Sequence, residues 1–229
     1  MTVATPAGFW RRYAAYSLDF AALGSLATLL TWSRLVAGGA EAAAAMRQLS
    51  DHLDRSLADA LPQGIAPTQL ASTLLADPRV QAGADAVQTG VVHMLLPWLL
   101  GYAGLAALYH IGFEHSRWQG SPGKHALDLV VVTAADDGRP SLSQIVVRHC
   151  AGALSWLTLN LGHALAAVPP QKRALHDYLA GTRVLCRDDN PRLPGWARAW
   201  LAMQVIACVA LLAWMLARYL AALQQASLA

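Results

Sequence analysis

The sequence predicts an all-α polytopic membrane protein with three spanning helices, a further apolar segment that either spans or re-enters the membrane, and a small cytoplasmic two-stranded β element. Composition is the first reason. Of the 229 residues, 55% are hydrophobic and only 14% are charged, against about 25% charged in ordinary soluble domains. Length is the second reason, because four apolar runs approach or exceed the roughly 20 residues that cross a bilayer. They cover residues 13–32, 91–113, 145–168 and 199–220.

The first apolar run begins after Arg11 and Arg12, as the hydrophobic part of a secretory signal would. It is too long for such a signal, Asp19 interrupts it, and three more apolar runs follow, so we expect an uncleaved membrane helix. An ionised carboxylate costs on the order of 3 kcal/mol at the centre of a spanning helix. Asp19 is therefore a candidate for either a functional or a structural role.

A polar segment, residues 37–89, separates the first two apolar runs. Its stretch "AAAAMRQLSDHLDRSLADAL" has helical periodicity, "PQGIAPTQ" interrupts the pattern, and a helical pattern resumes afterwards. We expect a helical hairpin outside the membrane. It is either a solvated linker or a cap that binds a partner.

Two short runs after the second apolar segment are typical of β-strands. The first, "LDLVVVT", is rich in β-branched residues and is followed by the turn sequence "DDGRP". The second, "GTRVLC", covers residues 181–186. Two isolated short strands would be marginally stable, so we expect them to pair with each other on one side of the membrane.

The distribution of basic residues predicts the orientation. Positive residues favour the cytoplasm, which places the N-terminus inside and residues 37–89 outside. If residues 145–168 crossed the membrane fully, the most basic part of the chain, residues 169–198, would lie outside. We therefore favour a bent, re-entrant segment that turns near residues 158–162, with a full span as the alternative. The basic residues concerned are Lys172, Arg173, Arg183, Arg187, Arg192 and Arg198.

A set of charged motifs resembles the RDD family of integral membrane proteins, which is named for one arginine and two aspartates. The set consists of Arg12, Asp19, "SPGKHALDLVVV", Arg148, and "KRALHDYLAGTRVL" with Asp177. The resemblance covers roughly residues 8–185 apart from the polar insertion, and the last apolar run lies outside it. It implies cation/proton exchange as the most concrete activity.

The resemblance and the apolar runs together predict four parts. Residues 1–36 form the N-terminus and first membrane helix, and residues 37–89 form the extracytoplasmic helical insertion. Residues 90–198 complete the RDD domain with the second membrane helix, the β element and the re-entrant segment. Residues 199–229 form a C-terminal membrane helix.

The resemblance also implies a buried polar cluster, or ion and proton site, made of Arg12, Asp19, Arg148 and Asp177. Arg12 and Asp19 are seven residues apart, which on an α-helix is two turns, about 10.5 Å, and nearly the same face. Both side chains could contribute to one site without contacting each other. Glu114 is expected to meet Arg148 or Lys124. The secondary candidates are His110, Glu114, His149 and His176.

We expect no metal site and no cofactor. His110 and Glu114 share a helical face, but their spacing departs from known zinc motifs. No further ligand follows at a spacing typical of a metal-binding motif. A catalytic nucleophile cannot be assembled from the sequence, so we expect no enzyme, and nothing indicates nucleic-acid binding. The remaining alternatives are a small transporter or a scaffold in a bacterial inner membrane. Either would have the lipid bilayer, and a second copy or another membrane protein, as its partner.

Overall fold

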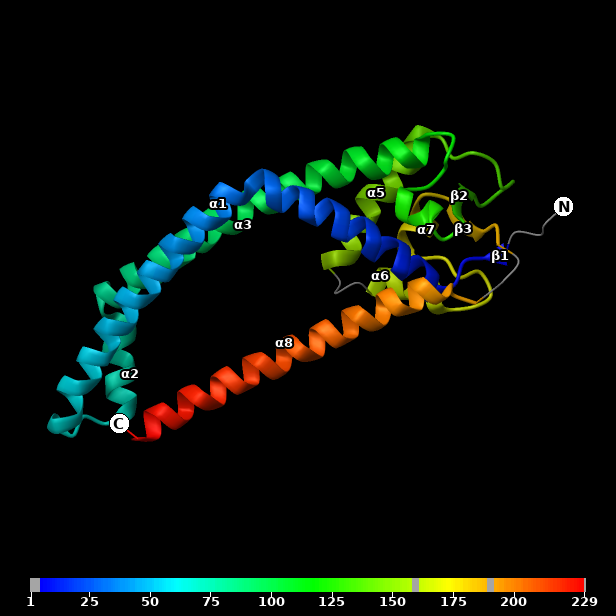
Figure 1. The fold of residues 1–229 in the computed structure, drawn as a ribbon. Coiled ribbons are helices and arrows are strands. Elements are labelled where there is room, and N and C mark those ends of the chain that lie inside the picture. Colours follow the sequence, from blue (N-terminus) through cyan, green and yellow to red (C-terminus); the bar gives the residue numbers. More distant parts are fainter. Residues whose placement is uncertain (1–4, 158–160, 189–191, 229) are drawn as a thin grey trace. The chain divides into compact units, whose positions relative to one another are not determined.

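The computed structural model describes residues 5–157, 161–188 and 192–228, and it is mostly helical (Figure 1). The helices are α1 (Phe9–Ala60), α2 (Pro67–Ala76), α3 (Pro78–His115), α4 (Pro122–His125), α5 (Leu142–Leu157), α6 (Leu161–Ala164), α7 (Leu175–Leu179) and α8 (Gly195–Leu228). Two 3-10 turns, η1 (Leu61–Gln63) and η2 (Leu165–Ala167), follow α1 and α6. The strands are β1 (Thr5–Pro6), β2 (Leu129–Thr133) and β3 (Thr182–Cys186).

Three helices in the described part of the chain are long and apolar enough to cross a membrane. They occupy Phe9–Gln63, Pro78–His115 and Gly195–Gln225. In the remaining apolar segment, residues 145–168, the described residues belong to α5, α6 and η2, apart from Val168 at the end of η2. The turn predicted near residues 158–162 falls partly on residues 158–160, which lie outside the described residues.

Helix α1 continues well beyond the first apolar run. Its 52 residues correspond to about 78 Å at 1.5 Å per residue, more than twice the roughly 30 Å of hydrocarbon in a bilayer. The helical pattern predicted for the polar segment is confirmed: α1 continues to Ala60, the helix is interrupted, and α2 follows. Pro62 lies in η1 and Gly64 follows with φ +62°, a conformation that favours glycine, before α2 begins at Pro67.

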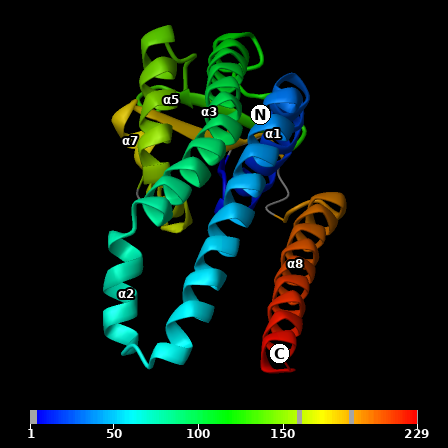
Figure 2. The same cartoon turned by 90° about the vertical axis from the view of Figure 1, so that its left-hand side faces the viewer.

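The chain divides into two compact units, which we describe separately. One contains residues 21–108 and the other contains residues 1–20 and 109–229. In the unit of residues 21–108, Figure 2 shows α2 in the connection between the long helices α1 and α3. The two long helices approach closely where glycines face the opposite backbone. A Cβ at Gly38 would lie 2.5 Å from the Met94 nitrogen, and one at Gly90 would lie 2.5 Å from the Ala42 nitrogen.

The second unit contains a three-stranded antiparallel sheet with the order β1-β3-β2. The predicted pairing of the two longer strands is confirmed, with Val131 opposite Val184. The prediction of only two strands was wrong, because Thr5 and Pro6 form a third strand beside Cys186 and Leu185. A two-residue strand that contains a proline has no alternating pattern, so the sequence gives no local signal for it.

Both faces of this sheet are buried. Val131 and Val184 pack with Ala14 and Ala15 of α1 and with Leu127. The opposite face buries Val130, Val132 and Leu185. The near-continuous apolar run of β2 follows from this two-sided burial. The small alanines let the first two turns of α1 lie close to the sheet, and the charged residues of α1 are thereby placed beside β3 and α7.

Candidate functional site

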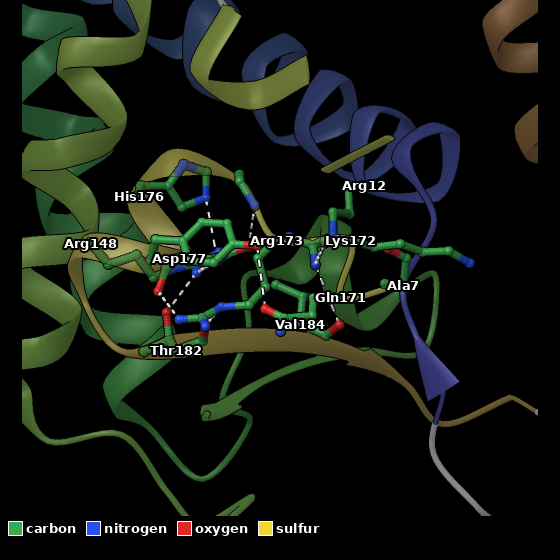
Figure 3. Close-up of polar contacts among 12 residues, drawn as sticks. Ala7, Arg12, Arg148, Gln171, Lys172, Arg173, His176, Asp177, Thr182 and Val184 are labelled. Atoms are coloured by element: carbon green, nitrogen blue, oxygen red, sulfur yellow. Dashed lines mark hydrogen bonds and ion pairs between the residues drawn. The ribbon is translucent and has the colours of Figure 1, made fainter. Parts of the chain in front are cut away.

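Asp177 is the centre of a buried charged cluster beside β3 (Figure 3). Its side chain is 0% exposed. Arg12 donates from Nη1 to Oδ2 across 2.6 Å, and Arg148 donates from Nη1 to Oδ1. The backbone N–H of Ala174 adds a bond of 2.9 Å to Oδ2. Both carboxylate oxygens are therefore occupied by charged donors, one from α1 and one from α5.

The two arginines are anchored by further acceptors. Arg12 donates to the carbonyl oxygens of Lys172 at 2.7 Å and of Ala7 at 3.2 Å. Arg148 donates to the Thr182 hydroxyl at 3.0 Å. These bonds tie α1, α5, β3 and the segment before α7 to one carboxylate. Because Arg12 and Asp177 are far apart in sequence, the cluster fixes tertiary rather than local structure.

Glu114 extends the cluster at the end of α3. Its Oε2 lies 3.3 Å from Nε of Arg148, and Lys124 donates to its Oε1. The expected contact of Glu114 with Arg148 or Lys124 is thus confirmed with both. The cluster holds three cationic and two anionic side chains: Arg12, Arg148 and Lys124 against Asp177 and Glu114.

Asp177 is held in its charged form. Burial by itself raises the pKa of a carboxyl group, but the nearby charges of Arg148 and Arg12 outweigh it and keep the pKa of Asp177 well below its usual range. The carboxylate therefore stays ionised at any physiological pH. Such a group is well suited to a permanent ionic bond and poorly suited to taking up and releasing a proton.

Asp19 binds a different set of partners. Its carboxylate is buried and accepts hydrogen bonds from the Tyr109 hydroxyl at 2.7 Å, the Ser121 hydroxyl at 2.5 Å and the Gly123 N–H at 2.7 Å. Among the described residues, Asp19 takes part in no ion pair. The structure thus brings Arg12, Arg148 and Asp177 into direct contact, whereas Asp19 is bound by neutral donors.

A family model, that of the RDD family, matches residues 6–181, the part of the chain that contains Arg12, Asp19, Arg148 and Asp177. The chain belongs to the RDD family. In the other comparisons, no curated protein and no solved structure is significantly similar to it. The matched region of this RDD protein contains both kinds of contact described above. Arg12 and Asp177 bind each other, and Asp19 binds the turn that opens α4.

That turn contains the site residues that the sequence reasoning missed. Ser121 caps α4, Pro122 begins it, and Gly123 lies so close to α1 that a Cβ there would overlap the Ala15 carbonyl oxygen and lie 2.7 Å from Oδ1 of Asp19. Ser-Pro-Gly is a recognisable helix start. Its attachment to an aspartate 104 positions earlier is not a local property of the sequence.

Four of the eight histidines of the RDD protein lie near the charged cluster. His176 lies 3.6 Å from Asp177, His163 faces His176 with ring centroids 4.9 Å apart, and His110 faces His149 at 6.0 Å. The described residues contain no group of three or more histidine, cysteine or acidic side chains that could hold a metal ion. The three cysteines are free, with Cys150 and Cys208 exposed and Cys186 buried.

Proposed function

We propose that this RDD-family protein is a non-enzymatic scaffold of a bacterial inner membrane. In this proposal, the cluster around Asp177 is a permanent ionic contact that stabilises the fold. The observation that carries this proposal is the enclosure of Asp177 by Arg12, Arg148 and a backbone N–H. A carboxylate that exchanges cations has to alternate between occupied and empty states. Asp177 already has charged partners on both oxygens, and a buried ion pair is costly to separate.

Under this proposal, the Asp177 cluster holds the sheet and α7 against the first membrane helix. Other surfaces of the protein bind a partner protein. The candidates are the helical insertion at residues 37–89 and the C-terminal helix α8. Leu61 and Leu75 in the insertion are 76% and 74% exposed. In α8, Leu212 is 59% exposed. The partner is a second copy of the chain or another membrane protein.

Site-specific photo-crosslinking in native membranes tests the scaffold. A photoreactive residue at position 75 or 212 is expected to yield a discrete protein adduct at one of the two positions. A photoreactive residue at position 187, on the exposed loop after β3, serves as the matched control. If both test positions give only lipid adducts or the same background as the control, the scaffold proposal is contradicted.

Cation/proton exchange at Asp19 is the second candidate, and one observation favours it. Asp19 lies in a candidate span, is buried, and contacts the neutral donors Tyr109, Ser121 and Gly123. Such a carboxylate could take a new partner without the separation of an ion pair. Intramembrane carboxylates are functional candidates for this reason.

Proteoliposomes distinguish exchange from scaffolding. Under the exchange hypothesis, the wild-type protein moves protons in response to a sodium or potassium gradient, and folded Asp19→Asn protein does not. Asp136→Asn, in the exposed turn after β2, is the matched control because it also removes one carboxylate. Absence of proton movement by the wild-type protein under either gradient favours the scaffold.

The proposed orientation places the N-terminus and the sheet in the cytoplasm and residues 37–89 outside. The apolar segment at residues 145–168 is proposed to re-enter the membrane. Two observations support this. Helix α5 has 16 residues, about 24 Å, which is short for a span of roughly 30 Å. The strands on either side of this segment, β2 and β3, pair with each other and therefore lie on one side of the membrane.

A further inference from the structure

Basic residues are concentrated in the unit that contains the sheet. Residues 1–20 and 109–229 hold thirteen lysines and arginines against eight aspartates and glutamates, whereas residues 21–108 hold four against six. Several of these cations are already neutralised by the ion pairs described above. Lys172 and Arg198 take part in no ion pair among the described residues. Their charges can therefore attract an anion from outside the protein.

The starts of α1 and α8 lie side by side. Ser17 of α1 accepts hydrogen bonds from Nε1 of Trp200 at 2.9 Å and from Nε2 of Gln204 at 3.2 Å. Ala197, in the first turn of α8, is fully buried in the core cluster that also contains Ala14. These contacts fix the beginning of α8 against α1 and the sheet. Because both helices are candidate spans, we expect them to enter the membrane from the same side.

Exposed tryptophans mark the level at which the two helices enter the membrane. Trp10 is the second residue of α1 and is 64% exposed, and Trp196 is the second residue of α8 and is 48% exposed. Tryptophan is enriched at the boundary between hydrocarbon and water, where its ring lies among the lipid headgroups. The first turn of each helix is therefore expected at the headgroup level.

Arg198 extends back along α8 to this level. A Cβ placed on Gly195 would lie 4.0 Å from Nη2 of Arg198, so the guanidinium is beside the first residue of the helix. Long basic side chains near the end of a membrane helix take this direction because it brings their charge into the headgroup region. Arg198 is also exposed. Its charge is thus placed where it would meet lipid phosphates.

Lys172 lies beside the residues that precede α1. Its carbonyl oxygen accepts from Nη2 of Arg12 at 2.7 Å, and Nε of Arg12 donates to the carbonyl oxygen of Ala7 at 3.2 Å (Figure 3). The N–H of Lys172 donates to the carbonyl oxygen of Val168 at 3.2 Å, and Val168 is 59% exposed at the end of the apolar segment. A partly exposed lysine just beyond an exposed apolar residue is typical of the membrane boundary.

We propose that Lys172 and Arg198, the interfacial basic pair, bind the phosphate groups of anionic phospholipids such as phosphatidylglycerol. This inference goes beyond the scaffold proposal and depends only on the insertion of α1 and α8 in a bilayer. Each juxtamembrane basic side chain strengthens the binding of anionic lipid by about fivefold. The excess of basic over acidic residues in the same unit adds a field that favours anions.

Native mass spectrometry of the full chain in detergent tests the interfacial basic pair. The protein is titrated with phosphatidylglycerol or with phosphatidylcholine of the same acyl chains, and we expect tighter binding of phosphatidylglycerol. Lys172→Gln and Arg198→Gln should each weaken the binding of phosphatidylglycerol by about fivefold and leave that of phosphatidylcholine unchanged. A role of these residues in folding alone would not discriminate between the two lipids.

Arg55→Gln is the matched control. It also removes one exposed arginine, but position 55 lies about 65 Å along α1 from Arg12, more than twice the roughly 30 Å of hydrocarbon. Arg198→Gln decides the matter if Lys172→Gln fails to fold beside Arg12. The proposal is overturned if the wild-type protein binds both lipids equally, or if folded Arg198→Gln binds phosphatidylglycerol as tightly as Arg55→Gln does. Displacement of phosphatidylglycerol by an equal concentration of inorganic phosphate would overturn the assignment to a lipid.

Discussion

Arg12 and Asp177 form an ion pair of 2.6 Å between residues 165 positions apart in the sequence. One lies near the start of the first membrane helix and the other in the short helix before β3. Their contact closes the unit formed by residues 1–20 and 109–229. Since the pair is buried, its removal should act on folding before it acts on any activity.

Removal of one partner should therefore destabilise the fold strongly. Loss of one member of a buried ion pair typically costs about 3–5 kcal/mol, because the other charge is left uncompensated. Arg12→Ala and Asp177→Asn should each lower the yield of folded protein and its thermal unfolding temperature in detergent, measured by size-exclusion chromatography and intrinsic fluorescence.

Arg183→Ala provides the comparison. Arg183 pairs with Asp137 on the surface, where the two side chains are 36% and 46% exposed, and such pairs contribute about 0–1 kcal/mol. Equal losses of stability for Arg12→Ala and Arg183→Ala would show that the buried cluster does not have the stabilising role proposed above.

Gly123 should be sensitive to the addition of a single methyl group. In Gly123→Ala, the new Cβ would overlap the Ala15 carbonyl oxygen and crowd the Asp19 carboxylate, so α4 would have to move away from α1. We expect a loss of stability of roughly 1–3 kcal/mol, as for other overpacked sites. Gly112→Ala in α3, where nothing lies within 4 Å, should have little effect in the same unfolding measurement.

The end of the helical hairpin should respond to acid through Asp77. Its carboxylate lies 2.8 Å from Nε2 of His52 and also accepts from the Arg79 N–H at 2.7 Å. The bond to His52, followed by that to Arg79, lowers the pKa of Asp77. A carboxyl group with a depressed pKa in the fold stabilises it above its unfolded pKa, and this contribution is lost as the pH falls through the folded value.

Hydrogen exchange across α2 and the first turn of α3 should accordingly increase once the pH falls below the usual range of an aspartate. Asp77→Asn should show the faster exchange already at neutral pH and lose the pH dependence. An acid response that is unchanged in Asp77→Asn would assign the effect to another carboxylate.

Cysteine accessibility tests the proposed orientation. In a background without exposed thiols, Arg187→Cys should resist a membrane-impermeant reagent applied to the periplasmic side, whereas Ser72→Cys in α2 should react. Both positions are exposed in the structure. Reaction of Arg187→Cys from the periplasmic side would show that residues 145–168 cross the membrane and would refute the re-entrant arrangement.

The sequence by itself determined the membrane class, the helical hairpin, the pairing of the two longer strands and the family. Each of these depends on local pattern: apolar runs of sufficient length, helical periodicity with proline and glycine at the interruption, or β-branched residues beside turn signals. The contact of Glu114 with Arg148 and Lys124 was also predictable, because a buried glutamate at the end of an apolar helix requires a basic partner.

Only the tertiary structure decided how the two aspartates differ. Asp19 and Asp177 are both buried acids in the RDD motifs, and the sequence placed them in one cluster. Asp177 is enclosed by two arginines, whereas Asp19 meets Tyr109 and the turn before α4. The partners of each aspartate depend on which loop packs on which face of α1. That packing is set by Gly123 and by contacts between residues more than a hundred positions apart, which no local pattern encodes.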